Sequence, residues 1–425
     1  MSGQKIASVR ARQTIDCNCR PMVEVDVVTD GGFLGRGAAP TGKSVGKYES
    51  FVLRDEDPNE YRGMGVRRAV RNVNETIAPK LIGMDVDDQE AIDGLMNEID
   101  GTENKSRLGG NAIYSTSIAC FRAAAACRKI PLYQYIAGGT IKSVPVPSFN
   151  MINGGRNGSV CQSINEFLVV PWRSTSIEKA VEAATLIFAE VGKVIESRCG
   201  RPALVGRSMG WVAPSEDPRE IFDILREAIH RAGFANLCSF ALDAAASEMY
   251  DEASGRYTMN GRQLSSAELV DYYVSLSEEL PLLFMEDILD ENDWEGYRLA
   301  HQKIQKSLII ADDLTATNAK RLQKAKAFEA IDGFILKPNQ VGSITEAMEA
   351  YRYAKKQNWV AIPSGRSGGV IDDVVMDFSV GLGVPFQKNG CPRSGERIEK
   401  LNFLIRASDL NGACPMADIS SYVRF

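Results

Sequence analysis

This 425-residue sequence contains only two histidines, no long apolar run and no strong net charge. The two histidines, His230 and His301, lie in amphipathic helix patterns and are interpreted as ordinary surface or core residues. No apolar stretch is long enough to span a bilayer, and the first residues lack the apolar core of a signal peptide. The net charge of −6 gives no general reason to expect nucleic acid or an anionic membrane as a partner.

Paired cysteines are also missing. The nine cysteines are odd in number, contain no Cys-x-x-Cys pair and have no histidine nearby, which disfavours a disulfide framework. Cys120 and Cys127 fall among alanines in an apolar helix pattern, where cysteine behaves as a small hydrophobe. We therefore expect reduced thiols and a cytoplasmic location. The 44% apolar content supports a substantial core, and the chain is too long for one ordinary domain.

The first third of the chain differs from the rest in its pattern of apolar and polar residues. Residues 22–28 alternate apolar and polar and return through a turn at Gly31 and Gly32, which is typical of an antiparallel hairpin. Helix patterns follow up to about residue 137. The sequence therefore predicts an N-terminal α+β domain over residues 1–138, with an antiparallel sheet and helices.

Residues 139–425 alternate short apolar runs with helix patterns and are expected to form a β/α barrel. No low-complexity linker separates the two domains, so they should pack tightly, with N-terminal loops roofing the active site. An N-cap oxygen followed by an acid three residues later marks four predicted helix starts, at Thr175, Asp217, Ser265 and Ser343.

Four charged residues each close a short apolar run in this second part. The runs end at Asp243, Glu286, Asp312 and Lys337, and the last two steps are 26 and 25 residues, enough for one strand and one helix. The longer step of 43 residues before Glu286 predicts an extra hairpin or helix. Because the C-terminal strand ends of a parallel barrel share one rim, we expect these four side chains to converge there.

The residue types on that rim indicate a chemistry. Three carboxylates without histidine or cysteine suit a hard divalent cation, Mg²⁺ before Zn²⁺. A lysine near a dication loses some preference for its ammonium form and can take a proton. The combination predicts removal of a proton next to a carboxylate, with the cation stabilising the enolate. The alternative is that the acids only cap helices or pair with surface cations, and four charges at successive strand ends disfavour it.

The segment Gly37–Ser44 fits the P-loop pattern Gly-x4-Gly-Lys-Ser letter for letter. A P-loop must open a helix, whereas Ser44 is followed by another strand-like run, residues 50–53. We therefore interpret the segment as a glycine-rich mobile lid and not as a nucleotide site.

Ten segments in order make the chain similar to enolase over nearly its whole length. They are Pro40–Gly46, Leu108–Ile113, Phe149–Gly155, Glu166-Phe167, Asp243–Glu248, Glu286-Asp287, Asp312–Asn318, Leu336–Gln340, Arg366–Gly368 and Arg393–Arg397. The resemblance implies an N-terminal α+β domain on a modified (β/α)8 barrel and a homodimer. It also implies Mg²⁺-dependent dehydration of 2-phosphoglycerate to phosphoenolpyruvate, which agrees with the general pattern of a lysine base beside Mg²⁺.

The resemblance also implies roles for individual residues. Asp243, Glu286 and Asp312 would bind the first Mg²⁺, and Lys337 would take the α-proton, as the residue types alone suggest. Lys388 would contact the substrate carboxylate. Arg366 and Ser367 would grip the phosphoryl group, for which a guanidinium beside a hydroxyl is suitable chemistry, and Ser44 on the lid would help bind a second Mg²⁺.

The chain departs from enolase on the side of the site where the hydroxyl leaves. The family's active-site glutamate is replaced by Ser208 or Met209, depending on where one extra residue is placed, and Asn157 and Gly365 stand at the positions of two histidines. Only Glu166 remains as a catalytic acid on that side. Losing a general acid forfeits about 10² to 10⁴ in rate, so ordinary enolase turnover should be poor unless another group substitutes.

The replacements add positive charge. Arg156 lies beside the first lost histidine, Arg207 lies beside the lost glutamate and Lys43 takes a small residue's place in the lid. We assign all three to substrate binding and expect a small phosphorylated or phosphonylated carboxylate with more negative charge than 2-phosphoglycerate. Their alternative is a role as ordinary surface charges.

Three functions follow from this pattern. The first is a lyase of enolase type acting on a more anionic substrate, as in formation of carboxyphosphonoenolpyruvate in phosphonate biosynthesis. The second is a divergent enolase that makes phosphoenolpyruvate. The third is a non-catalytic paralogue that acts as a binding protein, which the intact Asp243, Glu286, Asp312 and Lys337 disfavour.

Overall fold

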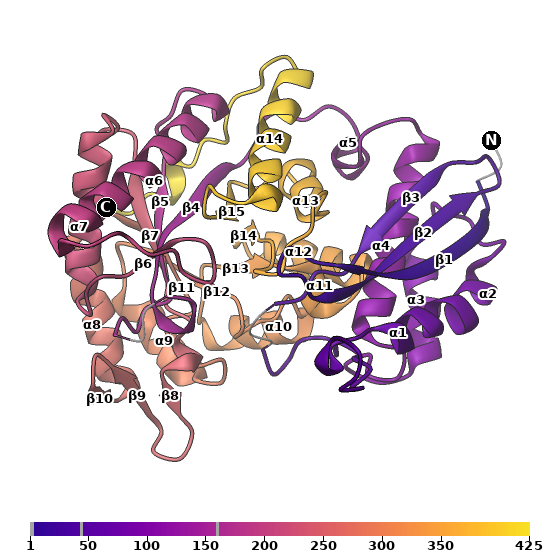
Figure 1. Cartoon of the computed structure of the whole chain (residues 1–425), viewed down its shortest axis with the longest axis horizontal. Coiled ribbons are helices and arrows are strands. Elements are labelled where there is room, and N and C mark those ends of the chain that lie inside the picture. The colour runs from indigo at the N-terminus through magenta and orange to yellow at the C-terminus, as the bar shows by residue number, and fades with distance from the viewer. Residues whose placement is uncertain (1–3, 43–45, 159–160) are drawn as a thin grey trace.

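A computed structural model describes residues 4–42, 46–158 and 161–425. Figure 1 shows an antiparallel sheet with its helices at one end of the molecule and a curled, mostly parallel sheet with helices at the other. This is the predicted fold class, an α+β domain packed on a β/α barrel.

The N-terminal sheet consists of three antiparallel strands, β1 (Ile6–Ile15), β2 (Pro21–Thr29) and β3 (Leu34–Ala38). Burial alternates along β2 from Val23 onward, as the apolar and polar pattern predicted. The connection to β3 contains Gly32, whose φ of 78° lies in the left-handed region that glycine tolerates. The predicted hairpin is therefore confirmed.

Helices cover one face of this sheet. The longest, α4 (Gly110–Cys127), packs directly on β3, and a Cβ at Gly35 would lie only 2.0 Å from the Ala119 carbonyl oxygen. The absence of side chains at such glycines lets the two backbones approach. The other segments are η1 (Tyr61–Gly63), α1 (Arg67–Arg71), η2 (Asn72–Ile77), α2 (Ala78–Leu81), α3 (Gln89–Asp100) and α5 (Leu132–Ala137).

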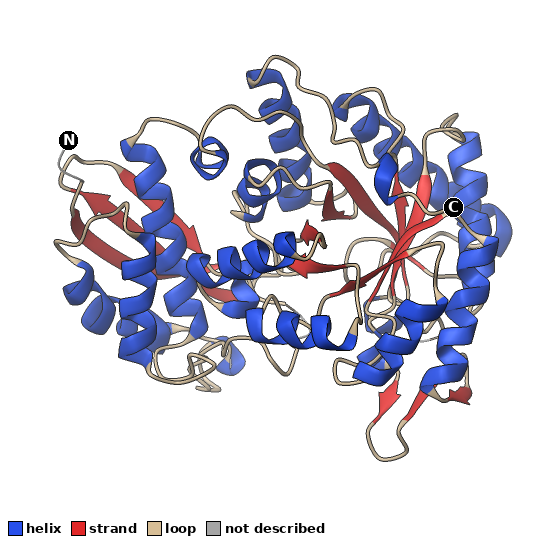
Figure 2. Ribbon diagram, turned by 180° about the vertical axis from the view of Figure 1, so that it is seen from behind, coloured by secondary structure: helices blue, strands red, loops and turns tan. Residues whose placement is uncertain are grey.

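Eight strands form the barrel, which Figure 2 shows surrounded by helices. A parallel bridge between Ser364 and Lys388 joins the last two strands and closes the ring. Most strand residues are buried on both faces, which explains the continuous apolar runs in the sequence. The strands, in ring order, are β4 (Val146–Asn153), β5 (Glu166–Val170), β7 (Ser239–Asp243), β11 (Leu282–Glu286), β12 (Leu308–Ala311), β13 (Gly333–Leu336), β14 (Val360–Pro363) and β15 (Phe386–Gly390).

One strand runs against the others. β5 pairs antiparallel with both β4 and β7, and Glu166 at its start lies opposite Asp243 at the end of β7. The first residue of β5 therefore shares the rim with the last residues of the parallel strands. Two consecutive helices, α6 (Ile177–Cys199) and α7 (Pro218–Arg231), lie between β5 and β7, and β6 (Trp211–Val212) pairs with β4.

The remaining helices of the barrel follow its strands in sequence. They are α8 (Ser266–Glu279), α9 (Trp294–Lys303), α10 (Ala319–Phe328), α11 (Pro338–Val341), α12 (Ile344–Lys356), α13 (Val375–Gly381) and α14 (Gly395–Leu410). Asp217, Ser265 and Ser343 are N-caps as predicted. The prediction of Thr175 was wrong by one residue, because Ser176 caps α6 by accepting a hydrogen bond from the backbone N–H of Lys179.

Two further predictions concern the long step before Glu286 and the residues that follow the predicted lid. The long step before Glu286 holds a small antiparallel sheet as well as α8, formed by β8 (Tyr250–Asp251), β9 (Arg256–Met259) and β10 (Arg262–Leu264). Residues 50–53 are not a strand, so that prediction was wrong; they lie along the barrel, where Ser50 donates to the Asn339 carbonyl at 2.9 Å. No helix begins between residues 46 and 60, which disfavours a P-loop.

Two absences hold within the described residues. None of their helices combines the length and apolarity needed to cross a bilayer. No disulfide links any of the nine cysteines.

Candidate active site

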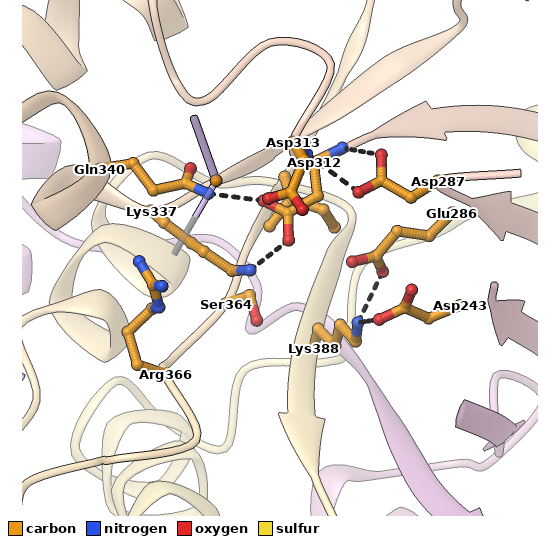
Figure 3. Close-up of polar contacts among 12 residues, drawn as sticks. Asp243, Glu286, Asp287, Asp312, Asp313, Lys337, Gln340, Ser364, Arg366 and Lys388 are labelled. Carbon is orange, nitrogen blue, oxygen red and sulfur yellow. Dashed lines mark hydrogen bonds and ion pairs between the residues drawn. The ribbon is translucent and has the colours of Figure 1, made fainter. Parts of the chain in front are cut away.

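The predicted charged residues meet on one rim of the barrel. Asp243 and Glu286 end β7 and β11, while Asp312 and Lys337 directly follow β12 and β13, and Figure 3 shows the four side chains turned toward one another. A cleft of about 110 Å³ opens over them. Local sequence explains the convergence, because each charge comes where its strand ends.

Lys388 on β15 supplies the positive charge at the centre of the acids. Its ammonium lies 2.6 Å from Oδ2 of Asp243, 2.7 Å from Oε2 of Glu286 and 3.3 Å from Oε2 of Glu166. Burial opposes the charged form of Lys388, but these carboxylates outweigh it and hold its pKa well above the ordinary value. The ammonium therefore compensates a concentration of negative charge.

Lys337 forms a second, largely buried ion pair. Its ammonium donates to Oδ2 of Asp312, whose other oxygen accepts from the Gln340 amide at 2.8 Å (Figure 3). Burial disfavours both charges of the pair, yet their mutual attraction raises the pKa of Lys337 and lowers the pKa of Asp312. As long as this contact persists, Lys337 is a proton-carrying ammonium.

Two acids that the sequence analysis did not assign reinforce this corner. Asp287 accepts hydrogen bonds from the backbone N–H groups of Asp312 and Asp313, at 2.8 and 2.9 Å, and thereby fixes the turn after β12. Burial and neighbouring carboxylates hold the pKa of Asp287 well above the ordinary value and raise the pKa of Asp313 to about 8. The sequence signal for both residues was the pair of adjacent acids at each strand end, Glu286-Asp287 and Asp312-Asp313.

The carboxylates fit a divalent cation. Glu286 is fully buried, and its Oε1 has no hydrogen-bond partner among the described residues. Burial and the Asp243 carboxylate hold the pKa of Glu286 well above its ordinary value, so an added positive charge would relieve a real electrostatic cost. Asp243, Glu286 and Asp312 could supply oxygen ligands, and Asp287, Asp312 and Asp313 form a second possible group.

Arg366 reaches the cleft from the loop after β14. Its guanidinium is buried and bonded to Glu49, with Nη1–Oε2 at 2.6 Å and Nη2–Oε1 at 3.1 Å. Ser367 also lines the cleft, and its carbonyl accepts from the Asn18 side chain at 2.8 Å. The N-terminal domain thus roofs this side of the cleft, as predicted, and Glu49 is a partner that the sequence analysis missed.

The opposite side of the cleft carries Glu166. It accepts a hydrogen bond from the Asn150 amide at 3.1 Å and lines the cleft together with Asn157 and Ser208. The Asn157 amide donates to Oδ1 of Asn165 at 3.0 Å. Of the two candidates for the missing glutamate's place, Ser208 therefore reaches the cleft lining and Met209 does not.

The structure does not bring Arg156 and Arg207 into this group. Both are exposed and neither lines the cleft. Nε of Arg156 lies 3.7 Å from Oε2 of Glu248, which does line it. The position of these long side chains depends on the conformation of the loops that carry them, which the adjacent residues in the sequence do not reveal. The predictions for Lys43 and Ser44 fall outside the described residues.

Neither histidine lies at the cleft, whereas one further lysine does. His230 is exposed and His301 lies beside Asp332, with Nε2–Oδ1 at 3.3 Å, so both are surface residues away from the cleft. Lys400 on α14 lines the cleft although the sequence analysis did not consider it. It lies inside a long helix, where no local signal marks it as functional.

A closed barrel with an α+β cap, and with acids and two lysines on one rim, defines a carbon–oxygen lyase of the enolase superfamily. The chain belongs to the enolase family. The family described as Enolase, N-terminal domain matches residues 6–136, and Enolase, C-terminal TIM barrel domain matches residues 141–418.

Full-length relatives from three archaea are each named Enolase. The protein of Methanosarcina barkeri is 38% identical over 422 residues, 99% of this chain and 97% of the relative. That of Methanopyrus kandleri is 42% identical over 414 residues, 96% and 97% of the two chains. That of Methanocaldococcus jannaschii is 40% identical over 403 residues, 95% and 94% of the two chains.

Proposed function

We propose that this protein removes the proton α to the carboxylate of a 2-phosphoglycerate-like substrate and eliminates water from it. The observation that carries the proposal is the pair of lysines, the largely buried Lys337 and the buried Lys388, each bonded to carboxylates at the ends of neighbouring barrel strands. A proton acceptor and a separate cation facing one small cleft are what abstraction next to a carboxylate requires.

Each side chain then has a part in binding or proton transfer. Lys388 holds the substrate carboxylate, and Arg366 with Ser367 binds the phosphoryl oxygens. Lys337 takes the α-proton once its contact with Asp312 loosens, because that contact keeps it protonated. Glu166 lies on the hydroxyl side, where it can give a proton to the leaving oxygen.

The carboxylates of Asp243, Glu286 and Asp312 are proposed to hold Mg²⁺. Bound Mg²⁺ would weaken the hold of Asp312 on the Lys337 proton and offset the negative charge that builds on the substrate carboxylate. The unpartnered Glu286 oxygen supports this assignment.

Two compounds are candidate substrates. A more anionic analogue, as in formation of carboxyphosphonoenolpyruvate, was first suggested by Arg156 and Arg207, which lie outside the cleft. Lys400 inside the cleft supports a more anionic substrate but does not select a carboxyphosphonate. The names of the relatives favour the second candidate, 2-phosphoglycerate itself. A homodimer and a cytoplasmic location are proposed on the family resemblance and the unbridged cysteines.

Proton NMR in D₂O tests the reaction. The protein with Mg²⁺ is offered 2-phosphoglycerate and then its carboxyphosphonate analogue, and loss of the α-proton signal is followed separately from appearance of vinyl protons. Exchange followed by vinyl product supports the proposal, and the compound that reacts identifies the substrate. If neither α-proton exchanges while Mg²⁺ still binds, the proposal fails and a binding protein becomes the better interpretation.

A further inference from the structure

Helix α14 carries a lysine whose ammonium has no hydrogen-bonded or ion-paired partner among the described residues. Lys400 is only 4% exposed and lines the same cleft as Lys337 and Arg366. Across residues 4–42, 46–158 and 161–425 its ammonium donates no hydrogen bond and forms no ion pair. Burial lowers the pKa of Lys400, with the nearby Asp373 carboxylate opposing the shift. The Asp373 and Glu396 carboxylates offset part of the cost of this buried charge, and an anion in the cleft would offset the rest.

Gly365 makes the room that this ammonium occupies. A Cβ built at Gly365 would lie 2.2 Å from Nζ of Lys400 and 3.2 Å from Oδ2 of Asp373. Any larger residue at position 365 would therefore push the ammonium away. Oδ2 of Asp373 is itself buried without a hydrogen-bond partner among the described residues. The alternative to a bound anion is that a water molecule bridges Lys400 and Asp373.

The position of Lys400 differs from those of the other cations. One turn earlier on α14, Arg397 donates to the carbonyl oxygen of Ser208, which lines the hydroxyl side of the cleft. Lys388 faces the strand-end carboxylates, and Arg366 is bonded to Glu49 under the N-terminal roof. Lys400 thus supplies a third cationic position beyond those proposed for the carboxylate and the phosphoryl group.

We propose, resting on the function proposed above, that Lys400 binds a third anionic group of the substrate, a carboxylate on the carbon that carries the leaving hydroxyl. Lys400 is then a specificity-determining residue, because a substrate without that group leaves its charge uncompensated. Gly365 is the residue that admits the ammonium to the cleft.

Two ligands that cannot lose water test this without turnover. They are 2-phospholactate and 2-phosphomalate, which differ only by a carboxylate on that carbon, and calorimetry with Mg²⁺ gives both dissociation constants. The wild-type protein should prefer 2-phosphomalate by about 10- to 100-fold, as expected for one buried charge-assisted hydrogen bond. Lys400→Met should abolish the preference and leave affinity for 2-phospholactate unchanged.

Companion variants separate binding from a structural role. Gly365→Ala should reduce the same preference, because the added methyl group displaces the ammonium without removing it. Lys400→Met should not lower the melting temperature, since it removes a buried charge that makes no hydrogen bond or ion pair with the described part of the chain. Lys356→Met, which removes an exposed lysine on α12, is the matched control and should change neither measurement.

Three outcomes overturn the inference. Equal wild-type affinity for the two ligands, with normal binding of 2-phospholactate, refutes the role of Lys400 and leaves the proposed function standing. Loss of affinity for both ligands in Lys400→Met assigns the lysine to binding of the phosphoryl group instead. If neither ligand binds the wild-type protein, the proposed function fails together with the inference.

Discussion

The guanidinium of Arg366 is held by the carboxylate of Glu49 through two hydrogen bonds of 2.6 and 3.1 Å, and both residues are buried. The pair joins the N-terminal domain to the barrel at the edge of the cleft. Burial opposes the charge on Arg366, but Glu49 more than compensates and raises the pKa of Arg366. Arg366 is therefore oriented by the cap before any substrate arrives.

Removing this carboxylate should be costly. Glu49→Ala is expected to lower the free energy of unfolding by about 3–5 kcal/mol, the usual cost of breaking a buried pair, as measured by urea denaturation. Inorganic phosphate should raise the melting temperature of the variant more than that of the wild type, because it compensates the same guanidinium. The control is Glu182→Ala, which breaks an exposed pair with Lys179 and should cost about 0–1 kcal/mol. Equal losses in the two variants would contradict the prediction.

The base assigned to Lys337 can be tested by isotope exchange. Lys337→Ala should slow exchange of the substrate α-proton with D₂O by about 10² to 10⁴, because no other described side chain on that rim can replace the amine next to Asp312. Proton NMR measures the exchange directly and does not depend on elimination. Lys326→Ala, an exposed change near the end of α10, should leave the rate unaltered. Persistent exchange in Lys337→Ala would rule out the assignment.

Two overlapping groups of carboxylates compete for the metal. They share Asp312, so substitutions outside the overlap separate them. If Asp243, Glu286 and Asp312 hold Mg²⁺, Glu286→Gln should abolish the rise in melting temperature that Mg²⁺ causes, whereas Asp313→Asn should retain most of it. The reverse result would move the ion to the group that contains Asp287 and Asp313. Glu295→Gln, an exposed change on α9, serves as the control.

The sequence predicted those parts of the site that depend on strand ends. Asp312 and Lys337 are close because adjacent parallel strands deliver their terminal residues to the same rim. Glu166 needs more than periodicity, since it reaches the rim by starting a strand that runs the other way. Its position followed from the family resemblance and could not follow from an apolar pattern alone.

The sequence could not place site residues that lie in loops or inside helices. Arg156 and Arg207 were assigned to the cleft because of their neighbours in sequence, yet both are exposed and neither lines it. Lys400 lies within an ordinary helix, and only the open space at Gly365 reveals that its ammonium faces the cleft. Such contacts depend on residues far apart in the chain, for which one sequence carries no local signal.

A carboxyl group outside the cleft lining should make stability depend on pH. Asp377 on α13 is 5% exposed, and burial raises its pKa from 3.8 to about 7, with Arg122 opposing the shift and Asp372 and Asp373 adding to it. Because the folded state then binds a proton that the unfolded state releases above about pH 4, stability should fall as the pH rises from 4 to 7.

Asparagine at position 377 imitates the protonated acid and does not titrate. The difference in free energy of unfolding between Asp377→Asn and the wild type should be constant below pH 4, shift in favour of the variant up to about pH 7, and then level off. Each pH unit within that window is worth up to about 1.4 kcal/mol. Urea denaturation across the range measures it, and Ser379→Ala on the same helix should give a difference that does not change with pH. A flat profile for Asp377→Asn would mean that Arg122 keeps this carboxylate charged in the folded protein, since only a protonated acid makes the asparagine advantage grow with pH.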